Sequence, residues 1–591
     1  MTKRTLVQTG SEKIMFDTEK KTGIFLFYIL LAVFTVSFIA KVYLVDGMLA
    51  FIDEASMFAT SYRFYQGDAI LVDDWSAPQL FGVALLPLFS IFRVFSDSNE
   101  GLYLFMRLNY VGLKLAILIY GIIKAKHMRL NRFYVYSGLF LWYIFSTSNM
   151  ETLTYQSMPL VLLMFVYIGA LADNSTKLEY FLMGLAYALS VLSQVFFILS
   201  YPIILIILIV RRKKTGKSNR SAVFFHLGIL SVFLGFLYLL FSRASLHDII
   251  VNLPYVFSEP DHDISGMNAI VSLLRKCVIT FGNLMLYRGR VMVCVNVLLL
   301  LILSIAFITK WGHRMRLRTL IPVSLLISIL GVAIEKCEPY MNMIFTPFIW
   351  ASIEALFFIQ DRRYLAYWIM SYMYTAAVAF GTNTGHSATS GTLILAAVIF
   401  IFFWAGVDEG LRNKDDAGNE QINRITKFLP HAAFFTAITC AILLSLVYKF
   451  SFTPWSNPHE PYRNFINRIM AGPMKGLYTT NGLYEIYMDT WNDIERIEKT
   501  EDTLLFCGTG NSMAFLDAEM RYGTMSTMFF YLDFDRVANY WRLHPDRIPT
   551  IIYFDYYSDD DVNSLMSILP AENYEIHRDG LKLFAIQKQT Q

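Results

Sequence analysis

An acidic pair, Asp53 and Glu54, directly follows the first long apolar block of the chain. The carboxylates of Asp68, Asp73 and Asp74 lie in the same polar stretch, which covers residues 46–77. A partly dehydrated carboxylate becomes more basic and attracts cations more strongly, so these residues are suited to general-base work or to holding a divalent metal. Solvated loop charges without a role are the plain alternative for any one of them.

Two other acidic groups are further site candidates. Asp261, His262 and Asp263, a close cluster in a polar loop, could bind a cation, although such clusters are often simply solvated. Glu335 and Glu338 lie between two apolar blocks, where a salt bridge would explain them equally well. The metal requirement therefore stays open, with Mg²⁺ or Mn²⁺ as the possible ion.

The composition is that of a membrane protein. Hydrophobic residues make up 55% of the chain and charged residues only 16%, whereas about a quarter of an ordinary soluble domain is charged. The apolar residues form blocks long enough to cross about 30 Å of hydrocarbon as helix. The net charge of +3 supports no nucleic-acid partner, and the five cysteines show no close pairing. We therefore predict a polytopic α-helical membrane protein with about 12–14 transmembrane helices.

The elements that must position the acidic stretch follow from the apolar blocks. The predicted spans are 24–45, 80–95, 102–123, 133–146, 153–171, 181–192, 195–210, 223–241, 291–309, 320–334, 340–358, 364–380, 392–405 and 429–447. The positive-inside rule assigns to the cytoplasm the basic segments 1–23, 124–132, 211–220, 310–318, 361–363 and 412–427. The segments then predicted outside are 46–77, 147–152, 242–290, 382–391 and 449–591. This alternation of cytoplasmic and outside segments requires 269–286 to be an interfacial helix that does not cross the membrane. It also requires either that 80–95 is re-entrant or that the basic loop 124–132 is an exception to the positive-inside rule.

The first outer stretch resembles the GT-C superfamily of membrane glycosyltransferases, particularly the branch of protein O-mannosyltransferases and bacterial lipid A aminoarabinose transferases. In that family an acidic pair follows the first transmembrane helix, and the next apolar segment begins near a Trp and a Pro. The matching residues here are Asp53, Glu54, Trp75, Pro78, Leu80 and Arg107. Weaker similarities to the family occur at 148–160, 184–202 and 381–391. The chain differs from the family at one step, because the family's double Pro is replaced by Ala77-Pro78.

The resemblance implies a glycosyltransferase that takes a sugar from a polyprenyl-phosphate carrier and passes it to an acceptor on the outer face, with inversion. Asp53 would be the general base, and Glu54 would orient that base or bind the sugar. Guanidinium groups would neutralise the phosphate leaving group. The predicted substrate-binding residues are Arg63, Asp73, Asp74, Arg107, Arg243, Arg288 and Arg290. For Arg243, Arg288 and Arg290 snorkelling to lipid headgroups is an equal alternative.

The domain organisation expected is a cytoplasmic N-terminus (1–23), a transmembrane domain (24–448) and an extracytoplasmic soluble α/β domain (449–591). The segments TLLFCG, PTIIYFD, YEIHR and KLFAIQ predict short buried strands, and 513–520, 536–541 and 561–568 predict helices between them. The CGTGN run at 507–511 indicates a tight turn rather than a nucleotide site, because it lacks the third glycine. By resemblance this domain would serve acceptor handling or packing.

The leading hypothesis is thus a multi-pass plasma-membrane enzyme whose partners are a lipid-linked sugar donor, a glycan, lipid or protein acceptor, and membrane lipids. A transporter or flippase for envelope lipids is the alternative from another class, and a non-catalytic scaffold is a third. A transporter should carry ionisable residues deep within its helices. The main candidates are Arg107, Lys114 and Glu354, and no internal repeat is visible.

Overall fold

The computed structural model describes most of the chain. It covers residues 29, 31–45, 53–76, 79–215, 220–258, 268–287, 289–309, 317–335, 343–356, 362–381, 389–415, 424–451, 460–497, 503–508, 512–527, 533–554, 559–569, 571–579 and 582–588. The predicted site residue Arg288, Pro78 of the family motif, and the Asp261–Asp263 cluster lie outside these ranges.

Helices make up the first three quarters of the chain. After a first helix, Leu31–Val42, the described α-helices are α2 (Asp53–Tyr65), α3 (Gln79–Phe95), α4 (Leu102–Lys124), α5 (Arg132–Ile144), α6 (Ser157–Leu171), α7 (Lys177–Ser193), α8 (Tyr201–Thr215), α9 (Arg220–Arg243), α10 (Leu246–Phe257), α11 (Asn268–Gly282), α12 (Arg290–Thr309), α13 (Leu317–Ile334), α14 (Thr346–Ala355), α15 (Arg362–Phe380), α17 (Ile394–Asp415) and α18 (Arg424–Ser451). Short 3₁₀ turns precede several of them, including η3 (Thr147–Asn149), η4 (Val195–Ser200), η9 (Met343–Phe345) and η10 (Ser390–Leu393).

The chain is a polytopic helical membrane protein with a small C-terminal α/β part. Four described helices are long and apolar enough to cross a membrane alone: Leu102–His127, Ala222–Arg243, Ser390–Glu409 and Leu429–Ser451. Seven more apolar helices of 10–17 residues accompany them, together with a pair, Leu274–Leu286 and Arg290–Ile305, bent by 97°. The Ser390–Glu409 helix is central, because 89% of its apolar 18-residue segment is buried inside the protein. The Ala222–Arg243 helix is peripheral, because only 17% of the corresponding segment is buried.

The helices follow the predicted blocks closely, with a few differences. The block 195–210 is divided, since η4 forms its first turns and α8 the remainder. The block 153–171 becomes helical only at Ser157, because Thr154 forms a turn in which its hydroxyl accepts from the backbone N–H groups of Gln156 (3.2 Å) and Ser157 (3.0 Å). The larger difference concerns the polar stretch 46–77, which we expected to be a loop and which contains the 13-residue helix α2.

Close helix crossings depend on small residues, as between α7 and α9. A methyl group at Gly184 would lie 2.0 Å from the carbonyl oxygen of Phe225, and one at Gly228 would lie 2.1 Å from that of Phe181. The two backbones therefore touch, which is the usual use of glycine at membrane helix contacts.

The C-terminal part forms the α/β unit that its strand pattern predicts. Its elements are β1 (Asn467–Arg468), β2 (Tyr478–Thr479), α19 (Asn481–Glu495), β3 (Leu504–Cys507), α20 (Ser512–Ala518), β4 (Arg521–Tyr522), α21 (Phe534–Leu543), β5 (Ile551–Phe554), α22 (Asp559–Ile568), β6 (Tyr574–Asp579) and β7 (Lys582–Gln587). The main sheet has the order β4-β3-β5-β7-β6, in which β3 pairs parallel with β4 and β5, and β7 pairs antiparallel with β5 and β6. The strands β1, β2 and β4, of two residues each, were not predicted.

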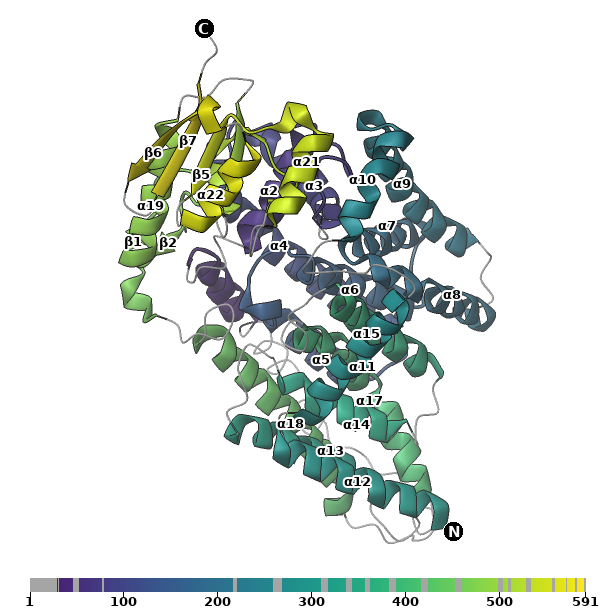
Figure 1. Cartoon of the computed structure of the whole chain (residues 1–591). Helices are drawn as coiled ribbons and strands as arrows, with labels where there is room; N and C mark the ends of the chain where they lie inside the picture. The colour runs from purple at the N-terminus through teal and green to yellow at the C-terminus, as the bar shows by residue number, and fades with distance from the viewer. Residues whose placement is uncertain are drawn as a thin grey trace, which may run out of the picture.

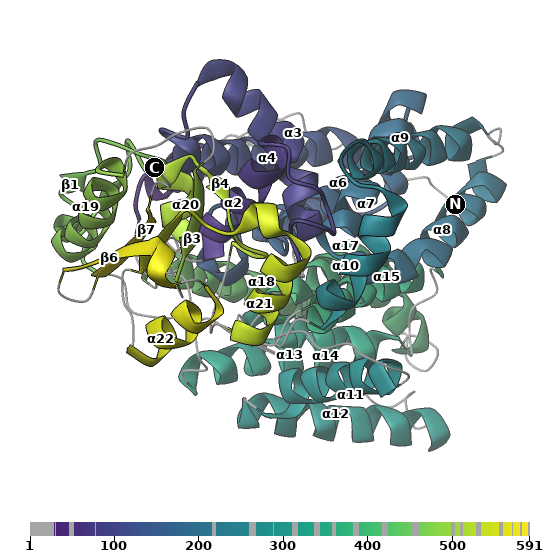
Figure 2. The same ribbon diagram turned by 45° about the horizontal axis from the view of Figure 1, so that its top comes forward.

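The C-terminal unit packs directly on the first helices of the chain. In Figure 1 its strands and α21 lie over α2 and α3 at one end of the helical bundle, and the tilted view in Figure 2 shows α20 and β4 beside α2. Backbone hydrogen bonds join the two parts, from Val45 to Tyr478 (2.9 Å) and from Trp75 to Met525 (2.8 Å). The C-terminal unit and the α2 stretch therefore lie on the same side of the bundle.

Candidate active site around α2

Helix α2 is short and buried on nearly every side. Its first turn carries Asp53 and Glu54 and its last turn Arg63, an arrangement that complements the helix dipole. Eleven of its thirteen residues, from Glu54 to Phe64, are buried. A helix of this length gains little from propensity alone, so packing against α3, α4 and the C-terminal unit must hold it in place.

Glu54 and Arg107 form a buried, two-pronged ion pair at the amino end of α2. Nε of Arg107 donates to one carboxylate oxygen of Glu54 (2.9 Å) and Nη2 donates to the other (2.6 Å). The remaining nitrogen, Nη1, donates to the carbonyl oxygens of Val42 (3.2 Å) and Leu44 (3.1 Å), at the end of the first helix. All three nitrogens of the guanidinium thus have protein partners, and the pair ties together the first helix, α2 and α4.

Asp53 precedes that pair and lacks such a partner. Its Oδ1 atom is shielded from solvent and accepts no hydrogen bond from the described residues. Burial raises the pKa of the Asp53 carboxyl from 3.8 to about 6. Two adjacent carboxyl groups thus occupy opposite environments: Glu54 is neutralised by a guanidinium, whereas Asp53 is partly dehydrated and its Oδ1 accepts no hydrogen bond from the described residues. A carboxyl with a pKa near neutrality is the form that general-base catalysis requires.

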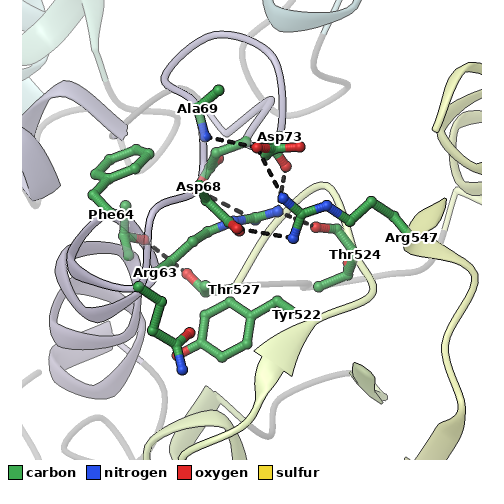
Figure 3. A network of polar contacts seen from close by, with 12 residues as sticks. Arg63, Phe64, Asp68, Ala69, Asp73, Tyr522, Thr524, Thr527 and Arg547 are labelled. Carbon is green, nitrogen blue, oxygen red and sulfur yellow. Dashed lines mark hydrogen bonds and ion pairs between the residues drawn. The ribbon is translucent and has the colours of Figure 1, made fainter. Parts of the chain in front are cut away.

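A second network holds the other end of α2 (Figure 3). Arg63 is fully buried and its Nε lies 2.6 Å from Asp68, while its Nη1 lies 3.6 Å from Asp74. Arg547 of the C-terminal unit reaches Asp68 (2.8 Å) and Asp73 (3.0 Å). The structure therefore brings the predicted residues Arg63, Asp73 and Asp74 together, in ion pairs that join the α2 stretch to the C-terminal unit.

The other predicted arginines lie apart from Asp53. Arg243, at the end of α9, donates to the carbonyl oxygens of Phe64 and Asp68, so it caps the carboxyl end of α2. Arg290 begins α12, whose label lies on the far side of the bundle from α2 in Figures 1 and 2. The backbone N–H groups of Arg290 and Val291 donate to the Glu335 carboxylate at 2.7 Å each, so this carboxylate caps a helix.

No metal site can be assembled from the described residues. Within these ranges no group of three or more His, Cys, Asp and Glu side chains could hold an ion. The carboxylates of Asp68, Asp73 and Asp74, which the sequence offers as cation ligands, are paired with arginines instead. Glu338 and the cluster Asp261–Asp263 fall outside the described ranges.

Sequence reasoning missed Arg547 and the buried lysines Lys41 and Lys449. Arg547 follows α21 in a soluble-looking segment, and nothing near it in the sequence marks it as a partner of Asp68. A third buried lysine, Lys114, stands out in the sequence as a charge inside a predicted span. For Lys41 and Lys449 the available signal is their position near the ends of apolar blocks.

Comparisons with known proteins give one similarity. No family model matches the chain, and no curated protein matches it. Among solved structures, the crystal structure of ArnT from Cupriavidus metallidurans bound to undecaprenyl phosphate is similar over 95% of this chain and 98% of that one, with 11% identity and a TM-score of 0.44. At this identity the role of each residue has to come from the geometry of this chain itself.

Proposed function

We propose that this chain is a membrane glycosyltransferase that transfers a sugar from a polyprenyl-phosphate-linked donor to a cell-envelope acceptor on the outer face, with Asp53 as the general base. The observation that carries the proposal is the Asp53 carboxyl, which is partly dehydrated, has an Oδ1 atom without a hydrogen-bond partner among the described residues, and has its pKa raised by burial to about 6. A structural carboxylate is normally paired or hydrogen-bonded when buried, so this one is suited to exchange a proton.

The proposed reaction is a single displacement at the anomeric carbon. An acceptor hydroxyl attacks that carbon while Asp53 takes the hydroxyl proton, and a new C–O bond forms. The bond between the anomeric carbon and the donor phosphate oxygen breaks, and its electron pair leaves with the phosphate. Asp53 ends the step protonated and returns its proton to water. A base with a pKa near 6 is mostly ionised at neutral pH and still has useful proton affinity.

Glu54 and Arg107 act in this proposal as positioning residues. Their two-pronged contact fixes the first turn of α2 relative to α4, and Asp53 is the residue that begins this turn. The network around Arg63 and Arg547 fixes the opposite end. Because both ends of α2 are fixed, Asp53 can keep its orientation toward the reacting hydroxyl better than a residue in a loop could.

The test uses purified protein in proteoliposomes with radiolabelled polyprenyl-phosphate sugars. The Asp53→Asn variant should lose sugar release and transfer by about 100-fold or more, as expected when a general base is removed. Asp489→Asn is the matched control, because Asp489 is an exposed carboxylate on α19 of the C-terminal unit, and this variant should keep parent turnover. Turnover in Asp53→Asn equal to that of the parent would eliminate Asp53 as the base.

One observation favours the transporter alternative. Glu354, on the apolar helix α14, is fully buried, and neither of its carboxyl oxygens has a hydrogen-bond partner among the described residues. Such a group inside a membrane helix is suited to proton-linked transport. Glu354→Gln should leave sugar transfer unchanged if the chain is the enzyme proposed here. Loss of lipid translocation in that variant, with no sugar transfer by the parent protein, would favour the transporter.

A further inference from the structure

One face of the small sheet formed by β1 and β2 is apolar and exposed. Side chains alternate between the two faces along a strand, so Ile466, Arg468 and Met470 share one face and Ile469 belongs to the other. Ile469 is buried, whereas Ile466 and Met470 are 66% and 60% exposed. Tyr478 of β2 pairs directly with Arg468, so its exposed ring lies on the same face. Ile466, Arg468, Met470 and Tyr478 together form the β1–β2 face.

Such exposure stands out within the C-terminal unit. Ile466 and Met470 are its two most exposed large apolar side chains among the residues that the structure describes. In Figures 1 and 2, β1 and α19 lie at the outer edge of the molecule. Neighbouring apolar side chains that a soluble unit leaves exposed on one face mark a contact surface. The β1–β2 face is therefore a candidate docking surface.

Strand β2 is joined to the end of the first helix. The N–H group of Tyr478 donates to the carbonyl oxygen of Tyr43 (2.7 Å), and its carbonyl oxygen accepts from the N–H group of Val45 (2.9 Å). Among the described residues of the first helix, Ile39 is the last large apolar side chain that is exposed. Tyr43 follows it by four residues, a distance of about 6 Å at the helical rise. The β1–β2 face thus begins directly after a lipid-facing helix surface.

The segment before β1 has the same relation to α18. The hydroxyl of Tyr462 donates to the carbonyl oxygen of Phe450, one residue before the end of α18 (3.2 Å). The ring of Tyr462 is itself exposed. Val447 is an exposed apolar side chain of α18 three residues before Phe450, which is about 5 Å along the helix. Two independent attachments therefore place this part of the C-terminal unit just beyond exposed apolar helix surfaces.

These distances correspond to the depth of the headgroup layer. Exposed apolar side chains of membrane helices contact hydrocarbon, and the polar headgroups occupy about 5–7 Å beyond the hydrocarbon on each side. Tyr462 and Tyr478 have the amphipathic rings that are enriched at this level. Arg468 can lay its apolar stem on the lipid and keep its guanidinium among the headgroups. The composition of the surface fits the depth that its attachments give it.

We propose that the β1–β2 face rests on the membrane leaflet, with Ile466 and Met470 inserted at the boundary between headgroups and acyl chains. The occupant is the phospholipid of the leaflet, because the lipid-facing surfaces of the first helix and α18 lead directly to this face. A second copy of the chain is the competing occupant. The proposal concerns membrane contact alone and does not depend on the reaction proposed above.

The contact has a consequence for the α2 site. Arg107, which pairs with Glu54, donates to the carbonyl oxygens of Val42 and Leu44, and β2 binds the same short segment through Tyr478. The segment 42–45 is thus held by α4 on one side and by the β1–β2 sheet on the other. A sheet resting on the leaflet therefore fixes the depth of the Glu54–Arg107 pair in the membrane.

The experiment is photo-cross-linking of the full chain in nanodiscs of phosphatidylethanolamine and phosphatidylglycerol that carry radiolabelled phospholipid. The photoreactive residue p-benzoylphenylalanine is placed, in separate proteins, at Ile466 and at Met470. Leu443, an exposed residue of α18, is the position that defines the labelling of a lipid-facing side chain. Ile576 is the matched control, because it is an exposed isoleucine of the same unit on β6, the sheet edge farthest from β4. Covalent lipid label on the denatured chain is measured after irradiation.

Label at Ile466 and Met470 should approach that at Leu443 and exceed that at Ile576 by about tenfold. Label no higher than at Ile576 would overturn the proposal. Cross-linked dimers in place of lipid label would also overturn it and would assign the face to a contact between two copies. Because the readout is lipid contact, a fully active Asp53→Asn variant would refute the proposed base and leave this result unchanged.

Discussion

Arg547 of the C-terminal unit lies 2.8 Å from the carboxylate of Asp68, while Arg63 of α2 lies 2.6 Å from the other oxygen of that carboxylate. One aspartate therefore joins two arginines that are 484 positions apart in the sequence (547 − 63). All three side chains are buried. The C-terminal unit consequently forms one wall of the α2 site.

The first prediction concerns this wall. Arg547→Ala should destabilise docking of the C-terminal unit by about 3–5 kcal/mol, because it leaves the carboxylates of Asp68 and Asp73 buried without one of their partners. Limited proteolysis should then cleave the C-terminal unit faster than in the parent. Arg542→Ala, a change at an exposed arginine of α21, is the control and should behave as the parent. Unchanged proteolysis of Arg547→Ala would show that the network does not hold the unit.

The second prediction is a pH profile. Asp53 has to be ionised to accept a proton, and its pKa of about 6 lies above its ordinary value. The transfer rate should therefore rise with pH, reach half its maximum near pH 6 and fall to roughly one-tenth at pH 5. Initial rates between pH 4.5 and 8, with donor saturating, measure this. A rate already constant at pH 5 would contradict a dehydrated base.

The third prediction is that Asp53→Asn stabilises the fold while it removes activity. The folded-state pKa of Asp53 is raised, so folding is most favoured where the carboxyl is protonated, and stability is lost as the pH rises from about 4 to about 6. At pH 7 the neutral amide avoids this penalty, which is at most about 3 kcal/mol for a shift of this size. Thermal unfolding of both proteins at pH 7 and at pH 4.5 measures the difference. The stability advantage of Asp53→Asn over the parent should be smaller at pH 4.5 than at pH 7. An equal difference at both pH values would argue that Asp53 does not titrate between them.

The fourth prediction separates pairing from charge at Glu54 and Arg107. Arg107→Met leaves the buried Glu54 carboxylate without a counter-ion and should destabilise the protein by about 3–5 kcal/mol. The double variant Glu54→Gln with Arg107→Met removes both charges and should recover a large part of that loss. Recovery of stability without recovery of transfer would show that the pair positions Asp53. A double variant no more stable than Arg107→Met would contradict the pairing.

Local patterns in the chain predicted most of its elements. The apolar blocks correspond to helices such as α4, α9 and α18, because a helix in hydrocarbon must satisfy its own backbone and needs only sufficient length and hydropathy. The four longer strands of the C-terminal unit lie where buried β-rich runs indicated them. Asp53 and Glu54 also stood out, because an acidic pair after the first apolar block resembles the GT-C pattern.

The roles of the charged residues were decided only by the tertiary structure. Arg63, Asp73 and Asp74 looked like substrate ligands in sequence, yet their partners include Arg547, which is hundreds of residues away. The buried lysines Lys41, Lys114 and Lys449 likewise come from three helices that are far apart in the sequence. Hydropathy and periodicity are properties of neighbouring residues and can be read along the chain. Ion pairing and dehydration depend on which side chains meet across the fold, so composition and spacing determined the membrane class, and packing alone decided which carboxylate was left without a partner.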